Sequence, residues 1–150
     1  MIRNIGGVVL GYITFALALF LAFSAAYLLM GANLAFRPHT YEPSNLWLVT
    51  SVILGTASSV VGGYVCALLA RGSKAPIALA ILVIVIGLLS AIPVLRAANT
   101  SKEQVPRPAE VSNLQAMQNA VQPGWMALLN PFVGAAGVLV GARLRRSPEN

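Results

Sequence analysis

The sequence predicts an all-α integral membrane protein, a bundle of four transmembrane helices forming one domain over residues 1–150. The chain is 57% hydrophobic and only 9% charged, with a mean hydropathy of +0.77, whereas soluble domains carry about 25% charged residues. Four apolar runs, at about 5–36, 46–70, 75–95 and 123–142, contain no Asp, Glu, Lys, Arg or His. Each is long enough for a helix to cross the hydrocarbon core. The runs are continuous, whereas the strands of a membrane barrel alternate apolar and polar residues, so helices are favoured.

The first run, residues 5–36, is longer than one membrane crossing requires. We therefore expect this helix to tilt or to project beyond the bilayer. A cleaved signal peptide is the alternative, with residues 1–4 as its charged start. The apolar core of a signal peptide is only about 7–15 residues, so the length favours an uncleaved first helix.

The second run contains many small residues, in the stretch GTASSVVGGYVCALLA. In a soluble helix each Gly would cost about 1 kcal/mol relative to Ala, but in lipid small residues let helix backbones approach closely. We predict small-residue packing stripes formed by Gly7, Gly11, Gly55, Ser59, Gly62, Gly63, Gly134, Gly137 and Gly141, and a weaker stripe on the third helix at Ala80, Gly87 and Ala91. Such stripes serve contacts within the chain, within a homo-oligomer or with a larger partner, and the alternative is that they line a pore or a solute crevice.

The third run, residues 75–95, leads into the longest polar segment of the chain, residues 96–122. Pro93 lies near the end of the run, and we expect it to help terminate the helix. The polar segment begins as a loop, and its second half shows helical spacing at Val111, Leu114 and Val121. This spacing indicates a short amphipathic helix on the outer surface. We expect it to pack on the bundle, and a lid or a partner-docking surface is the alternative.

The fourth run contains a candidate helix break at Asn130 and Pro131. Pro131 has no N–H to donate to the carbonyl of Ala127, which predicts a kink at this point. In membrane helices a neighbouring polar group commonly bonds the backbone that the proline leaves free, whereas transporters build solute sites from broken helices. We expect Asn130 to have the structural role. A cysteine at position 130 should then react slowly with a water-soluble thiol reagent.

The positions of Lys and Arg predict the orientation in the membrane. Segments 1–4, 71–74 and 143–150 are short and carry a high density of positive charge, whereas segments 37–45 and 96–122 are longer and carry less. Cytoplasmic loops are enriched in Lys and Arg. We therefore expect short cytoplasmic connections, both termini in the cytoplasm and one long outer loop.

Several classes of chemistry lack the residues that they require. The single cysteine, Cys66, excludes catalysis by a cysteine pair, and the single histidine, His39, makes a poor metal site with Glu42. No apolar run carries the carboxylate or histidine that proton-coupled transport normally uses. The basic residues flank apolar runs instead of forming a patch, which argues against a nucleic-acid partner. We expect no catalytic residues, no metal and no cofactor.

Three segments carry a resemblance to a known group. They are Gly62-Gly63-Tyr64 followed by an ALLAR end, the connection into APIALAILVIVIGLLS, and the final GWMALLNPFVGAAGVLVGARLRR. Together they resemble a family of small uncharacterised four-helix bacterial inner-membrane proteins. In that family a Gly-Gly-Tyr-like segment ends the second helix, a tryptophan opens the fourth, and a Gly-rich stretch closing on Arg ends the chain. The resemblance implies the architecture and a bacterial cytoplasmic (inner) membrane, and it implies no activity.

These observations lead to two functional hypotheses. The first is a non-enzymatic integral membrane protein that packs with itself, as a homo-oligomer, or with a larger membrane protein as an accessory subunit. The alternative is a small transporter or channel for an apolar or weakly polar solute, with a passage near Ser59, Tyr64 and Asn130. Both require the lipid bilayer as the surroundings of the chain.

Overall fold

The computed structural model describes residues 2–70, 74–99, 108, 112, 115 and 119–146. Four long helices account for most of these residues: α1 (Ile2–Ala35), α2 (Asn45–Leu69), α3 (Lys74–Asn99) and α5 (Gly124–Arg146). All four are long and apolar enough to cross a membrane. The prediction of an all-α chain with four candidate membrane-spanning helices is therefore confirmed.

Two predicted helix features are wrong. α3 continues beyond Pro93 to Asn99, so this proline does not end the helix. α5 continues through Pro131, so Asn130 and Pro131 do not interrupt it. Membrane helices tolerate proline because local adjustments and neighbouring groups satisfy the backbone carbonyl that loses its partner.

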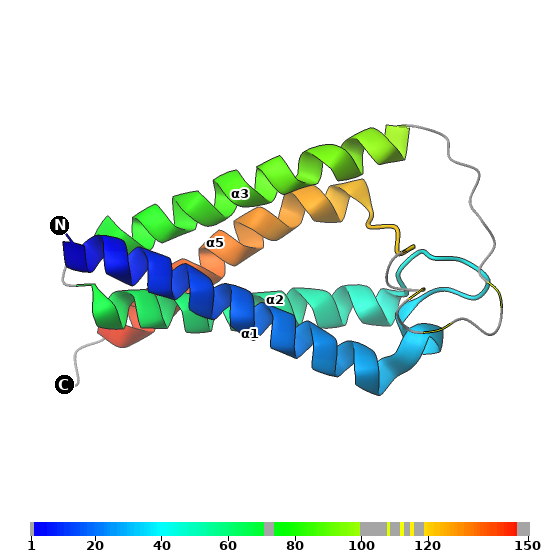
Figure 1. Cartoon of the computed structure of the whole chain (residues 1–150), viewed down its shortest axis with the longest axis horizontal. Coiled ribbons are helices and arrows are strands. Elements are labelled where there is room, and N and C mark those ends of the chain that lie inside the picture. Colours follow the sequence, from blue (N-terminus) through cyan, green and yellow to red (C-terminus); the bar gives the residue numbers. More distant parts are fainter. Residues whose placement is uncertain are drawn as a thin grey trace.

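The helices pack in the order α1, α2, α5, α3. α1 packs along α2, α2 along α5 and α5 along α3, while no Cα atoms of α1 and α5 lie within 8 Å of each other in the described residues. Figure 1 shows that the α1–α2 pair and the α3–α5 pair converge at the end that holds both chain termini, and diverge toward the loop that joins α1 to α2. We call these the termini end and the loop end. The bundle is therefore open between its two helix pairs at the loop end.

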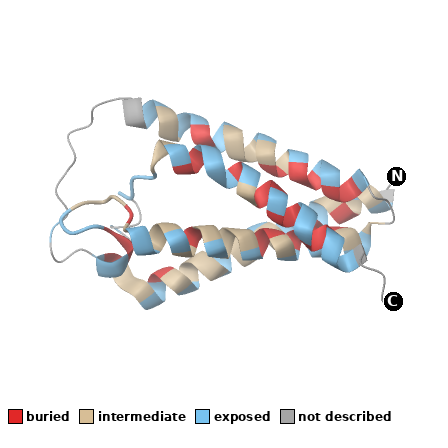
Figure 2. Cartoon of the chain, turned by 180° about the vertical axis from the view of Figure 1, so that it is seen from behind, coloured by how far each residue is buried: buried red, intermediate tan, exposed pale blue. Residues whose placement is uncertain are grey.

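The main core lies where the helices converge. Its buried members include Cys66 from α2, Leu79 and Val83 from α3, and Val138 from α5, with Phe15 of α1 packed against them. Burial differs among the helices, since α5 is the most buried and α1 the least (Figure 2). α1 thus lies at the edge of the bundle, with α2 as its main support.

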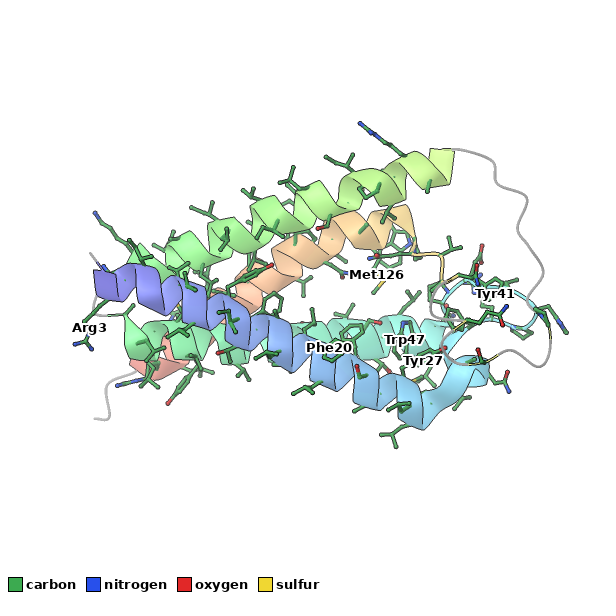
Figure 3. The ribbon with its side chains drawn as sticks, in the orientation of Figure 1. Arg3, Phe20, Tyr27, Tyr41, Trp47 and Met126 are labelled. Carbon is green, nitrogen blue, oxygen red and sulfur yellow. The ribbon has the colours of Figure 1, made fainter. Side chains whose placement is uncertain are left out.

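The loop end of α1 and α2 is held by a second, aromatic cluster. α1 bends at Gly31, whose φ of 66° is a left-handed conformation that glycine adopts without a steric penalty. Phe36, beyond the bend, packs together with Tyr27, Tyr41 and Trp47. The rings of Tyr27 and Trp47 lie 5.7 Å apart in an edge-to-face arrangement (Figure 3). The bend turns the end of this long helix back over α2.

The loop between α1 and α2 is closed by hydrogen bonds. Arg37 donates its backbone N–H to the carbonyl of Glu42 at 2.9 Å, and the Ser44 hydroxyl caps α2 by accepting from the N–H of Trp47 at 3.1 Å. Val121, just before α5, donates its N–H to the carbonyl of Tyr41 at 3.0 Å. The approach to α5 is therefore tied to this loop. The predicted amphipathic helix in the second half of 96–122 falls largely outside the described residues.

Candidate functional site

The glycines of α1 lie in its contact with α2. A Cβ added to Gly11 would lie 2.6 Å from the Cβ of Cys66, and one added to Gly7 would lie 2.9 Å from the Cβ of Ala70. Both separations are too short for real Cβ atoms. α1 and α2 therefore approach more closely than two side-chain-bearing positions would allow.

The adjacent glycines of α2 face different helices. A Cβ on Gly62 would lie 2.6 Å from the Cβ of Phe15 in α1, whereas one on Gly63 would overlap the carbonyl oxygen of Val138 in α5. Successive residues of a helix are about 100° apart around its axis. α2 thus needs two consecutive glycines because it lies between two closely packed neighbours.

The small residues of α5 complete these contacts. A Cβ on Gly141 would overlap the carbonyl oxygen of Val60, and one on Gly137 would overlap the hydroxyl of Ser59. Ser59 is completely buried and donates to the carbonyl of Thr56 at 2.8 Å. On the other side of α5, a Cβ on Gly134 would lie 3.1 Å from a methyl group of Val83 in α3.

Gly55 departs from the predicted stripe. No atom of another helix lies within 4 Å of the position that its Cβ would take. Gly55 therefore does not pack against another helix of this chain. Its spacing from Ser59 and Gly62 was correct for one face of α2, but at this level α2 has no close neighbour on that side.

Pro131 occupies a position that the sequence did not predict. A Cβ added to Gly87 of α3 would lie 2.5 Å from the Cγ of Pro131. The proline ring therefore packs directly against the backbone of α3. Gly87 is an isolated glycine in its apolar run. It lies opposite Pro131 because of the position of α3 along the axis of α5, which the sequence of neither helix gives.

A crevice of about 230 Å³ lies between α1, α3 and α5. α1 contributes the rings of Tyr12 and Phe15, and α5 contributes Asn130 and Pro131. α3 supplies a row that includes Val83 and Ser90, and Gln122 closes the crevice from the segment before α5. The crevice follows the opening between the two helix pairs.

Four side chains give the crevice its polar groups, namely Tyr12, Ser90, Gln122 and Asn130. Ser90, Gln122 and Asn130 are all exposed, and none of their side chains forms a hydrogen bond with another residue that the structure describes. Asn130 thus does not bond backbone near Pro131 within this part of the chain, which differs from the role that we expected. Its carboxamide is free to bond a molecule in the crevice.

The three residues of the predicted passage do not come together. Asn130 lines the crevice, but Ser59 is buried between α2 and α5, and Tyr64 is 42% exposed on α2 and does not line it. Ser59 and Tyr64 thus do not belong to the crevice that Asn130 lines. Ser90 and Gln122, which the sequence analysis did not select, take their place. Both are common polar residues with no motif, so only the fold could have identified them.

The remaining candidate residues stay apart from the crevice. Cys66 is buried in the main core, and His39 is exposed in the loop at the opposite end of α2. Within the described ranges, no group of three or more His, Cys, Asp or Glu could hold a metal ion. The crevice is thus the candidate site of this molecule.

Comparison of the chain with protein-family models, with curated proteins and with solved structures gives no match. The resemblance to small four-helix bacterial membrane proteins stays a prediction.

Proposed function

We propose that this chain is a non-enzymatic, multi-pass membrane protein that binds a small, weakly polar solute in the crevice between α1, α3 and α5, as a small transporter or channel. One observation carries the proposal: the side chains of Ser90, Gln122 and Asn130 line the crevice with no hydrogen-bond partner among the described residues. In hydrocarbon an unsatisfied polar group costs several kcal/mol. Three such groups in one crevice favour water or a polar ligand as its occupant.

The small residues pack helices of this chain against one another, which favours solute binding over association with a second copy or a partner protein. Apart from Gly55, every glycine of the predicted stripes lies against another helix of the same chain. The close approach that these residues permit is therefore used within the bundle. It no longer supplies a reason for a second copy or a partner to pack there.

Association through α1 is the second candidate function. Toward the loop end, the exposed surface of α1 carries Leu28 and Leu29, which are 72% and 87% exposed. A homo-oligomer or a larger membrane protein that covers this face would bury them. A cysteine at Leu29 in a Cys66→Ser chain should then form a disulfide-linked dimer on oxidation, or crosslink to a partner. A cysteine at Ile77, exposed on α3, is the control.

We place the chain in the bacterial cytoplasmic membrane with both termini in the cytoplasm. Arg3, Lys74, Arg143 and Arg145 are exposed at the termini end, where Figure 1 places the start of α1 and the end of α5. At the loop end, Arg37 is 3.4 Å from the carboxylate of Glu42. Positive charge at the termini end supports a cytoplasmic location. The crevice then opens toward the outer surface.

The proposal is tested by the water accessibility of position 130. Asn130→Cys in a Cys66→Ser background is compared with Leu129→Cys, which lies at the same depth on α5 and outside the crevice lining. Only a thiolate reacts with a maleimide, so labelling requires water at the sulfur. We expect a water-soluble maleimide to label position 130 several-fold faster than position 129. This expectation reverses the one drawn from the sequence, because the structure places Asn130 in the crevice.

Equal rates at the two positions would refute a hydrated crevice. Asn130 lies six residues after Gly124, which is about 9 Å along α5. Shallow depth alone would expose both cysteines equally. Only an excess at position 130 therefore supports the proposed function.

A further inference from the structure

The polarity of the crevice changes along its length. A Cβ on Gly124 would lie 3.1 Å from a methyl group of Leu95, so these two residues lie at one level near the loop end. At a rise of about 1.5 Å per residue, Ser90 and Asn130 lie about 7–9 Å below that level, and Val83 lies about 18 Å below it. Gln122 lies at the opening, before α5 begins. The hydrogen-bonding groups of α3 and α5 thus lie in the half of the crevice nearer the loop end.

The deeper half is mainly apolar and aromatic, and the Tyr12 hydroxyl is its polar group. It is lined by Phe15, Val83 and Ile86, with the Tyr12 ring in edge-to-face contact with Phe15 at 6.3 Å. Below it lies the closely packed core around Leu79 and Val138. An occupant that follows this profile has an apolar body pointing toward the termini end and a polar group toward the loop end.

The lining also restricts the charge of the occupant. Within the described part of the chain, no Lys, Arg, His, Asp or Glu lines the crevice. A charged group at this depth would need an oppositely charged partner or contact with water. The available groups are two carboxamides and two hydroxyls, which suit a neutral carbonyl or hydroxyl group.

The crevice is open on the side that faces the bilayer. The two helix pairs diverge toward the loop end (Figure 1), and α1 packs against α3 much less extensively than α5 does. The close contact between α1 and α3 lies toward the termini end, where a Cβ on Gly11 would lie 3.0 Å from a methyl group of Leu79. A molecule dissolved in the membrane can therefore reach the crevice between α1 and α3 without passing through water.

We infer that the ligand of this crevice is a neutral amphiphile that enters from the bilayer, with its carbonyl or hydroxyl group bonded by Asn130 and Ser90 and its apolar chain against Phe15, Val83 and Ile86. This inference rests on the proposed function and names its ligand class. The volume of about 230 Å³ exceeds the roughly 150 Å³ of a cavity that holds benzene. It is smaller than the about 300–1,000 Å³ of most drug-binding pockets. One short chain with one polar group fits this range.

The test uses a reporter that leaves Asn130 intact. Ser90→Cys in the Cys66→Ser chain is reconstituted in phosphatidylcholine vesicles and labelled with a water-soluble maleimide. Leu89→Cys is the control, because Leu89 is adjacent, 61% exposed and outside the lining. The added probes are decanol, which is neutral, decanoate and decyltrimethylammonium, which carry opposite charges on a chain of the same length, and butanol, which is neutral and water-soluble.

We expect decanol alone to protect the reporter. At about twice its Kd it should slow labelling of Ser90→Cys about threefold by mass action, without affecting Leu89→Cys. Adding Asn130→Ala should raise the decanol concentration needed for the same protection about twofold to tenfold, as expected for one lost hydrogen bond. Asn130→Gln, which keeps the carboxamide, should restore part of the protection.

The other outcomes separate the two proposals. Protection by either charged probe would overturn the neutral character of the ligand, and protection by butanol as strong as that by decanol would overturn its entry from the bilayer. Either result would leave a solute-binding crevice. Rapid labelling of Ser90→Cys that no probe slows would also overturn the inferred ligand and leave the solute-binding crevice. Equal slowing of Ser90→Cys and Leu89→Cys would show an effect on the bilayer and would also overturn the inference. If Ser90→Cys reacts no faster than Leu89→Cys without any probe, the crevice is not hydrated and the proposed function itself fails.

Discussion

Replacing Gly63 with alanine adds one methyl group where two helix backbones are in contact. The new Cβ would overlap the Val138 carbonyl oxygen, and it would lie 2.7 Å from both the carbonyl carbon and the Cα of Val138. These are backbone atoms, so no side-chain rotation can relieve the overlap. α2 and α5 would have to move apart along an interface that also contains Gly137 and Gly141.

The cost follows from overpacking. Adding a methyl group to a well-packed interior typically costs about 1–3 kcal/mol. The higher helix propensity of alanine offsets about 1 kcal/mol at most. In a chain of this size each kcal/mol changes the Tm by about 2–4 °C. We therefore expect Gly63→Ala to lower the Tm in mild detergent by several degrees, and Gly141→Ala to do the same because it would overlap the Val60 carbonyl oxygen.

Gly55→Ala is the matched control for this prediction. It makes the same change in the same helix, at a position where nothing lies within 4 Å. We expect its Tm to equal or exceed that of the unchanged chain. Thermal unfolding would be followed by the loss of the monodisperse peak in size-exclusion chromatography after heating. Equal Tm values for Gly63→Ala and Gly55→Ala would show that α2 and α5 are not packed as described.

Three further predictions concern the topology and the loop between α1 and α2. Reporter fusions at residue 150 and near residue 110 should place the C-terminus in the cytoplasm and the long loop outside, and an external C-terminus would refute the orientation. Ser44→Ala should lower stability by about 1 kcal/mol through loss of the α2 cap, whereas the exposed neighbour change Leu46→Ala should have a smaller effect; the reverse order in thermal unfolding would contradict the cap. His39 has a φ of 60°, so His39→Gly should stabilise the loop by up to about 1–2 kcal/mol, and a lower Tm than that of His39→Ala would contradict this.

The sequence alone was sufficient to predict the number of long helices and their approximate bounds. The lengths of the four apolar runs predicted each helix to within four residues at either end. This succeeds because a helix in lipid must satisfy its own backbone hydrogen bonds over the full thickness of the hydrocarbon. Length and apolarity are properties of one segment, so they can be read without knowing its neighbours.

Small residues were predictable as a class, but their partners were not. The sequence indicated that Gly62 and Gly63 permit close packing, and the structure assigns Gly62 to α1 and Gly63 to α5. The same pattern predicted Gly55, which has no neighbour. Which face of α2 meets which helix depends on the packing order α1, α2, α5, α3, and that order is set by contacts between segments distant in the chain.

The crevice was decided by the tertiary structure alone. Asn130 could be singled out from the sequence because it is polar and next to a proline, but Ser90 and Gln122 become significant only where α3 and the approach to α5 face α1. Pro131 likewise packs against Gly87 of α3. Neither segment alone shows which residues of two helices lie opposite each other. The sequence determined four apolar helices and the small residues that allow them to touch. The fold determined which pairs touch, and left α1 and α5 apart with the polar groups of the crevice between them.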